Sequence, residues 1–287
     1  MPMVRYKALA ITTKYWKPGN DHVEEILDGV KDKISNQDFV AVSEKAISTA
    51  LKNIVDEDNV EPSLAAELVA KYWMPIVWGY ILGRLCHFGE RLIGYLRGYP
   101  SDAGSRHKQV ALQHAGWLKA LMFGSEGGID GTNLPFSYVS LPLSYADEIA
   151  QEIRAKIELR LGKKVSVMIV DTDKTYSFRN FHFTPRPGAI NGIHSYGGFI
   201  AYVAGRFFKL KKRPTPVAVA GCRVSVEEAL TVADTAGRVM GFGAGKTVWD
   251  MAERFTVGLA DVSWEMLETV THKPIAIVRK RRRRKTC

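Results

Sequence analysis

The stretch Val165 to Asn180, VSVMIVDTDKTYSFRN, decides the fold. Its first six residues, Val165 to Val170, form an uncharged run rich in β-branched side chains, which predicts a strand buried on both faces. The triplet Asp171-Thr172-Asp173 follows at the expected carboxyl end of this strand, where open α/β sheets place their ligands. Two carboxylates that flank a hydroxyl offer hard oxygen ligands to Mg²⁺ or Mn²⁺, and the alternative is an Asx turn that only ends the strand. On these residues alone, both interpretations stay open.

A glycine-rich stretch, Gly124 to Pro135 (GSEGGIDGTNLP), favours a binding site. Asp130 and Asn133 lie in this stretch, where backbone N–H groups are unencumbered and can approach phosphates. An amphipathic helix is expected over 145–161 and leads into the strand at Val165. The order of helix, glycine turn, buried strand and acidic triplet predicts a mixed α/β fold.

Periodicity and turn residues predict the other elements. Residues 73–96 are rich in Trp, Tyr and Leu, which is typical of a core or a subunit interface, and His107 and His114 are interpreted as structural or surface residues. The sequence GFGAGKT at Gly241–Thr247 resembles a P-loop, but it is one residue too short for the Walker pattern. Strands are expected at 6–13, 38–42, 165–170 and 274–278, helices at 22–34, 63–73, 145–161 and 226–240, an apolar run at 217–220, a turn at 17–20 and a polar loop at 100–105.

The net charge of +10 is concentrated at the C-terminus, where residues 279–285 read RKRRRRK. Removing these seven basic residues from the total of 40 leaves 33 against 30 acidic residues, so the body carries only about +3. The body is therefore no obvious nucleic-acid binder. The tail, 279–287, is expected to be a disordered arm that could contact nucleic acid through 279–285.

The three cysteines are widely spaced and form no CxxC pair, which argues against a disulfide framework or a zinc site and fits a reducing cytoplasm. The N-terminus lacks the apolar core of a signal peptide. The most apolar stretch, 72–83, is too short to span a bilayer. We therefore expect a cytoplasmic protein.

Several short motifs, taken together, resemble one enzyme family. They are Lys17-Pro18-Gly19-Asn20-Asp21, the stretch VSEKAISTA at 42–50, Gly128-Ile129-Asp130-Gly131-Thr132-Asn133, Val170 to Asp173, and the closing segment 256–279 with Asp261 and a Pro-Ile-Ala-Ile-Val-Arg strand. In this order they resemble the coenzyme F-420 γ-glutamyl ligases, which join L-glutamate to a phospholactyl deazaflavin with GTP and a divalent metal. The resemblance covers most of residues 5–60, 124–198 and 245–279.

The resemblance implies a set of site residues. Asp130 and Asp171 would ligate Mg²⁺ or Mn²⁺, with Thr172 or Asp173 at a second metal. Ser48, Asn133, Thr13 and Lys14 would bind the nucleotide, and Lys45 and Arg179 would act in catalysis. Asp130 and Asp171 are expected to lie within reach of one cation, roughly 5 Å or less apart given Mg²⁺ ligand distances of about 2.0–2.1 Å. The family also implies an intertwined homodimer.

Departures from the family pattern leave the acceptor open. Thr49 stands where the family usually has lysine, and Thr271-His272-Lys273 replace an acidic glycine-rich element. Two insertions, near 73–123 and 199–244, would interrupt a single interleaved domain over 1–278. The main hypothesis is a GTP- and metal-dependent ligase, and the alternatives are a paralogue with another acceptor or a non-catalytic protein that binds nucleotide or nucleic acid through its tail.

Overall fold

The computed structural model describes residues 5–281. The strands are β1 (Tyr6–Thr13), β2 (Phe39–Ser43), β3 (Ile54–Asp56), β4 (Tyr138–Ser140), β5 (Ser166–Phe178), β6 (Phe181–Thr184), β7 (His194–Ser195), β8 (Lys211–Ala220) and β9 (His272–Lys280). The helices are α1 (His22–Val30), α2 (Glu44–Ala50), α3 (Leu64–Leu68), α4 (Gly83–Leu85), α5 (Glu90–Arg97), α6 (Ser101–His114), α7 (Trp117–Ala120), α8 (Ala146–Leu161), α9 (Gly198–Phe207), α10 (Val226–Met240), α11 (Val248–Phe255) and α12 (Trp264–Glu268). Two short 3₁₀ turns, η1 (Glu57–Asn59) and η3 (Leu259–Asp261), and one π-helix, η2 (Val69–Leu82), complete the set.

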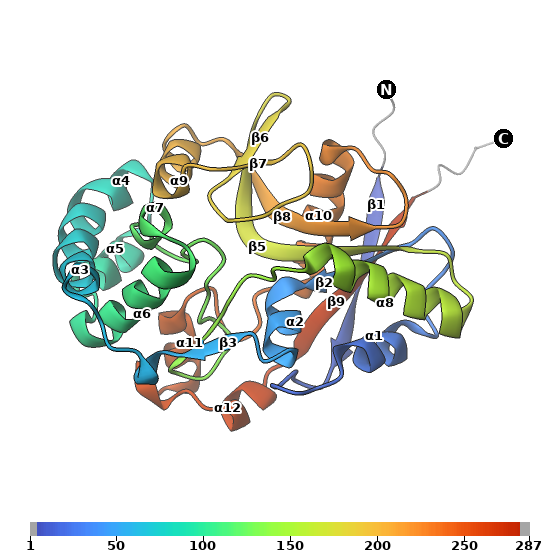
Figure 1. Ribbon diagram of the computed structural model, residues 1–287, viewed down its shortest axis with the longest axis horizontal. Coiled ribbons are helices and arrows are strands. Elements are labelled where there is room, and N and C mark those ends of the chain that lie inside the picture. The colour runs from blue at the N-terminus through green and yellow to red at the C-terminus, as the bar shows by residue number, and fades with distance from the viewer. Residues whose placement is uncertain (1–4, 282–287) are drawn as a thin grey trace.

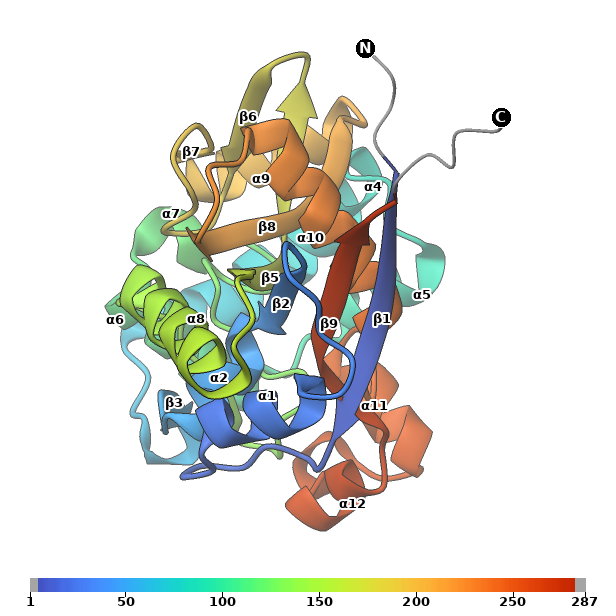
Figure 2. The same ribbon diagram turned by 90° about the vertical axis from the view of Figure 1, so that its right-hand side faces the viewer.

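A seven-stranded mixed sheet forms the centre of the molecule (Figure 1). Its strand order is β1-β9-β2-β5-β6-β7, and β8 also pairs with β5. Strands β2 and β5 are parallel, whereas β9 is antiparallel to both of its neighbours, β1 and β2. The first and last strands of the chain therefore lie side by side, as Figure 2 shows from the edge of the sheet.

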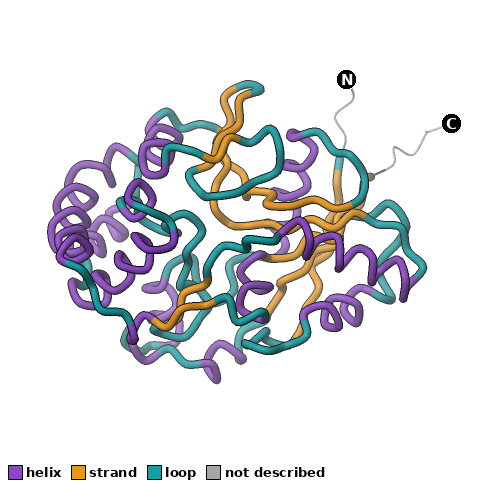
Figure 3. The backbone as a smooth tube through the Cα atoms, in the orientation of Figure 1, coloured by secondary structure: helices purple, strands orange, loops and turns teal. Residues whose placement is uncertain are grey.

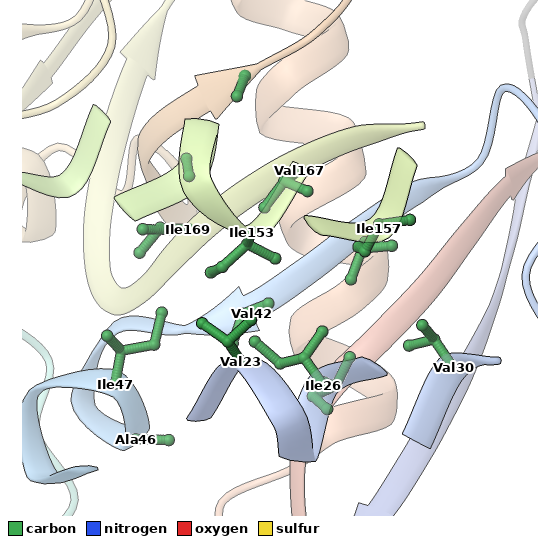
Figure 4. Close-up of a cluster of buried hydrophobic side chains, with 14 of the residues drawn as sticks. Val23, Ile26, Val30, Val42, Ala46, Ile47, Ile153, Ile157, Val167 and Ile169 are labelled. Carbon is green, nitrogen blue, oxygen red and sulfur yellow. The ribbon is translucent and has the colours of Figure 1, made fainter. Parts of the chain in front are cut away.

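The sheet is covered by helices on both faces, and alternation along the strands explains why. In β2, Val40 and Val42 face the core beneath α1, α2 and α8, whereas Ala41 faces the core beneath α10. Because successive side chains of a strand point to opposite faces, a run without polar residues requires cover on both. Figure 4 shows the first of these cores, where Ile26 of α1 and Ile153 of α8 point toward the strands.

A helical lobe stands beside the sheet and is built mainly from residues 64–123 together with α9 (Figure 3). Its centre is the fully buried Trp78, whose ring packs against Phe88, Phe123 and Tyr202. The indole N–H groups of Trp73 and Trp78 both donate to the carbonyl of Leu121, at 2.9 and 2.8 Å. These two bonds connect the π-helix η2 to the segment that follows α7.

The organising strand is longer than the sequence pattern predicts. β5 continues through Asp171-Thr172-Asp173 to Phe178, so it is longer than the strand expected at 165–170, and the alternative of an Asx turn that ends the strand is wrong. Its pairing with β8 breaks register between Asp171 and Lys174 and then resumes. The acidic triplet therefore lies in an irregularity in the middle of a strand, a feature that re-aims side chains next to functional sites.

Other expectations are confirmed or corrected by the element bounds. The strand at 6–13 and the helix at 226–240 are confirmed, and the helix expected at 145–161 begins one residue later. The helix expected at 22–34 ends at Val30, and the loop expected at 100–105 is instead the start of α6. The last strand does not end at Val278 but continues to Lys280.

Arg279 explains that extension, because its guanidinium binds the buried carboxylate of Asp38 at 2.6–2.7 Å. The first residues of the basic run therefore belong to the fold. Residues 282–287 lie outside the described part of the chain, so a nucleic-acid contact through 279–285 stays a prediction.

Candidate active site

A cavity of about 880 Å³ opens between the sheet, the helical lobe and the C-terminal helices. Its wall combines the start of α2, the loop 122–135, the irregular part of β5, the loop before α11, and side chains from α5, α6 and α9. A cavity of this size is sufficient for a nucleotide-sized ligand.

Lys45 and Asp130 form the first pair of charges in this cavity. Lys45 lies in the first turn of α2, which Ser43 caps by accepting from Ala46 N. Its ammonium group donates to Asp130 Oδ2 at 2.5 Å, to the carbonyl of Thr132 at 2.8 Å, and to the Thr132 hydroxyl. Asp130 also accepts the backbone N–H of Thr132 at 2.7 Å. The lysine therefore fixes the tip of the glycine-rich loop at the cavity wall, with its charge paired to Asp130.

Asn133 lies in the cavity wall, but its amide is already engaged. It adopts a left-handed backbone conformation, its Oδ1 accepts from Ala244 N at 2.6 Å, and its Nδ2 donates to Phe242 O at 3.1 Å. These bonds hold the loop 241–247 against the glycine-rich loop. That loop follows helix α10 rather than a strand, which agrees with the rejection of a P-loop.

A buried ionic network lies under the acidic triplet. Arg186, whose side chain is fully buried, donates to Glu44 at 2.8 Å, and its Nε lies 3.1 Å from Asp171 Oδ2. The second contact is ionic only, because the N–H is not directed at the oxygen. Among residues 5–281, the buried oxygens Asp171 Oδ2, Asp173 Oδ2 and Ser125 Oγ have no hydrogen-bond partner.

Unpartnered carboxylate oxygens in a shielded place are electrostatically costly. Burial, and next the negative charge of Asp171, raise the pKa of Asp173 well above its usual range. Burial also raises the pKa of Glu44, although the Arg186 guanidinium opposes this effect. Carboxylates that accumulate without enough donors provide the electrostatic conditions for binding a cation.

A second ionic cluster supports the opposite wall and consists of Glu57, His107, Lys108 and Glu126. His107 bridges Glu57 Oε1 at 2.7 Å and Glu126 Oε2 at 2.9 Å, and Lys108 donates to Glu126 Oε1 at 2.5 Å. Burial alone would lower the pKa of His107, but the charges of Glu57 and Glu126 outweigh it and raise that pKa to about 10. The same cluster lowers the pKa of Glu126 to about 2 against the opposing effect of burial. His107 thus joins α6 to the glycine-rich loop and to η1.

The structure brings together only part of the predicted site. The side chains that line the cavity are Lys45, Asp130, Asn133, Asp171, Thr172 and Asp173. Four other predicted residues do not line it: Ser48, Thr13, Lys14 and Arg179. Ser48 is buried and donates to Leu141 O at 2.9 Å, Lys14 pairs with Glu25 at 2.6 Å, and Thr13 donates to the adjacent carbonyl of Lys14.

Arg179 is at the turn between β5 and β6, where it lies over the ring of Phe178. Sequence reasoning missed Glu44 and Arg186, which form an ionic network with Asp171 of the acidic triplet. Arg186 sits between two prolines in TPRPG, and its burial leaves no signature in a single sequence. Sequence reasoning also missed the ionic cluster of His107, because the spacing of His107 and Glu126 carries no recognisable pattern.

Comparison with known proteins agrees with this arrangement. The sequence profile of the F420-0:gamma-glutamyl ligase family matches residues 10–247. The chain belongs to this family. The matched range contains Lys45, the glycine-rich loop and the acidic triplet, as well as both segments that were expected to be insertions. The predicted resemblance is therefore confirmed, and the protein is a member of a ligase family associated with coenzyme F420 biosynthesis.

A relative from Methanocaldococcus jannaschii, described as an uncharacterized protein, is 34% identical over 285 residues, which cover 95% of this chain and 96% of the relative. The sequence similarity thus extends over nearly the whole of both chains. Within residues 5–281, no helix has both the length and the apolar character needed to cross a membrane.

Proposed function

We propose that this protein is a GTP-dependent ligase that forms an amide between an acceptor carboxylate and L-glutamate through an acyl phosphate. The observation that carries the proposal is the convergence of Lys45, Asp130 and the irregular, acidic part of β5 on one cavity. Membership of the F420-0:gamma-glutamyl ligase family supports the reaction type. Phosphoryl transfer is catalysed mainly by positioning and charge stabilisation, which is what this wall offers.

The acidic triplet fits Mg²⁺ or Mn²⁺. Asp171 and Asp173 each direct a buried oxygen without a hydrogen-bond partner, and hard carboxylate oxygens suit these ions. Within residues 5–281 no three His, Cys, Asp or Glu side chains are arranged to hold an ion by themselves. Mg²⁺ commonly takes one or two carboxylates and completes its shell with water and substrate phosphates, so Asp171 and Asp173, with Asp130 nearby, are sufficient. When bound, the ion would neutralise the charge that develops on the phosphates.

The proposed reaction has two steps, to which the side chains contribute charge and positioning. In the first step an acceptor carboxylate oxygen attacks the γ-phosphorus of GTP, the bond to the β-phosphate oxygen breaks, and GDP leaves. In the second step the glutamate amine attacks the acyl carbon, phosphate leaves, and the amine gives up a proton. Lys45 supplies a positive charge beside Asp130, and Arg186 holds Asp171 through an ionic contact. The glycine-rich loop offers backbone N–H groups to the phosphates.

Aromatic side chains of the helical lobe and of α11 lie at the cavity wall. Tyr95 and Trp249 stack at 5.1 Å, and Phe123 lies 6.2 Å from Trp249, all three at the cavity wall. Such aromatic faces suit a planar group, a deazaflavin included. A paralogue whose acceptor is another planar group is the second candidate, and it shares the nucleotide chemistry.

We also propose a homodimer. The π-helix η2 exposes Tyr72, Ile76 and Tyr80, each about half accessible, on one face of the lobe. Clustered apolar side chains of this kind are typical of protein interfaces. Light scattering should give a mass of twice the 32.0 kDa chain, and the Ile76→Asp variant should halve that value. A monomeric wild-type protein would contradict the dimer.

The ligase proposal is tested by measuring the binding of GTP, in the presence of Mn²⁺, with titration calorimetry. Asp171→Asn and Asp173→Asn should each weaken binding at least about tenfold, because each removes a charged ligand. Asp147→Asn is the matched control, since Asp147 is exposed on α8, away from the cavity. Incubation with L-glutamate and a deazaflavin acceptor should then add one glutamyl mass to the product. The proposal would be refuted if the affinity for GTP were the same with and without Mn²⁺ and the same in wild type and both variants.

A further inference from the structure

Three cationic side chains meet in a part of the cavity wall that the ligase reaction described above does not use. They are Lys174 of β5, Arg206 of α9 and Lys212 of β8. Figure 1 shows α9 between the helical lobe and the end of the sheet formed by β5, β6 and β8.

The strand register explains why the two lysines share a face. Tyr176 lies opposite Lys212, and Lys174 lies opposite Pro214, in an antiparallel pair. Residues two apart on a strand, and residues directly opposite on the partner, point to the same side of a sheet. Lys174, Tyr176 and Lys212 therefore face one way, and α9 covers that face.

The contact between α9 and the sheet is close. A side chain at Gly205 would begin only 2.3 Å from the ring of Tyr176. This approach brings the next residue of α9, Arg206, over the same face of the sheet.

None of these cations forms an ion pair within residues 5–281. No carboxylate oxygen lies within 4.0 Å of Lys174, Arg206 or Lys212. By contrast, Arg213, which alternates with Lys212 along β8 and points to the other face, pairs with Glu227 at 2.7 Å. Fixed cations that converge on a cavity without counter-charges are typical of an anion site.

Arg206 is also held in place for such a contact. Its guanidinium lies 4.9 Å from the ring centre of Phe88 and 4.8 Å from that of Tyr202. Stacking uses the faces of the guanidinium and leaves the N–H groups at its edge available. Arg206 Nε and the hydroxyl of the buried Tyr176 lie near each other but make no well-directed hydrogen bond within the described chain. An anion would satisfy donors that otherwise cost free energy.

The electrostatics agree with the geometry. Partial burial, and next the positive charge of Arg206, lower the pKa of Lys212. Lys212 is thus held in surroundings that disfavour its own charge. A bound anion would reverse this effect.

We propose that Lys174, Arg206 and Lys212 form an anion-binding subsite that holds a phosphate or carboxylate group of the acceptor substrate. This assignment rests on the proposed ligase function. The subsite is distinct from the metal and nucleotide residues, because two of its members come from residues 199–220, which contribute none of the residues assigned to metal or nucleotide. The acceptor would then carry a second anionic group besides the carboxylate that reacts.

The test uses the full chain, with inorganic phosphate as the probe and titration calorimetry at constant ionic strength. Arg206→Gln and Lys212→Gln should each weaken phosphate binding by about tenfold or more, the scale of one lost charge-assisted contact. Lys212 is exposed at the cavity mouth, so its substitution leaves the core intact even if Arg206→Gln destabilises the aromatic stack. Lys211→Gln is the matched control: it removes the same charge one position along β8, on the opposite face, and should leave binding unchanged.

A second arm separates the phosphates of the nucleotide from those of the acceptor. Binding of GTP with Mn²⁺ should change less than twofold in Lys212→Gln and Arg206→Gln. Equal losses for phosphate and for GTP would assign the cations to the nucleotide and overturn the proposal, as would phosphate affinities that do not differ among wild type, Lys212→Gln and Lys211→Gln. If wild type fails to bind GTP but the phosphate results hold, the ligase function fails while the anion subsite stands.

Discussion

Replacing His107 with glutamine should remove a large pH dependence from the stability of the fold. The ordinary histidine pKa of 6.5 rises to about 10 in the cluster with Glu57 and Glu126. At 1.36 kcal/mol per pH unit, this difference corresponds to on the order of 4–5 kcal/mol in favour of the protonated, folded state. Because the folded pKa is the higher one, this stabilisation is complete below pH 6.5 and is lost as the pH rises through about 10.

The assay is urea unfolding followed by tryptophan fluorescence at several values between pH 7 and pH 9.5. Over this range the folded protein holds one more proton than the unfolded chain, so wild-type stability should fall by about 1.4 kcal/mol per pH unit from His107 alone. Burial lowers the pKa of Lys108 in the same cluster, so the comparison of the two slopes reports on the cluster that His107 completes. His114→Gln is the control, since His114 is exposed on the same helix. Parallel profiles for wild type and His107→Gln would refute this account of the cluster.

Three further substitutions test the packing around the site, each by urea unfolding. Arg186→Met should cost about 3–5 kcal/mol, because it leaves two buried carboxylates without their cation; a loss below 1 kcal/mol would contradict the network. Gly205→Ala should cost about 1–3 kcal/mol by forcing α9 off the sheet, whereas Gly94→Ala, with nothing within 4 Å, should be neutral or stabilise by up to about 1 kcal/mol. Arg279→Met should lower the free energy of unfolding by about 1–3 kcal/mol, because it leaves the buried Asp38 without its ionic partner. An unchanged stability would show that Arg279 does not contribute to the fold.

The parts of the fold that local pattern determines could be predicted from the sequence. Helix α10 agrees with its predicted bounds because a capping serine, Ser225, precedes an apolar stripe that repeats with helical period. The buried half of β5 was predicted because Val165 to Val170 contains no charged residue. The continuation of β5 was not, because it depends on β8, whose pairing resumes at Lys174 after the irregularity.

The candidate site divides in the same way. Asp130 and Asp171 could be singled out because glycines and a strand mark their positions. The buried residue that pairs with Asp171 could not be singled out from the sequence. Arg186 is 142 positions from Glu44, and a buried charge has no local signal that distinguishes it from a surface one. Likewise, Lys174 and Lys212 become neighbours only through the register of two strands. Helix α6 was missed because its first turn contains Ser101, Asp102 and Gly104, which favour turns.

The position of β9 has a consequence for how the protein is made. This strand is the last element of the described chain, yet it lies between β1 and β2, two of the earliest. While the polypeptide is still being synthesised, β1 has no partner in the sheet and one edge of β2 is open, because the strand that joins them is still inside the ribosome. The sheet can therefore close only after β9 has left the ribosome, and until then the backbone edges of β1 and β2 are exposed to aggregation or to chaperones. Nascent chains stalled before residue 272 should retain protease-sensitive N-terminal strands, whereas chains in which β9 has emerged should not.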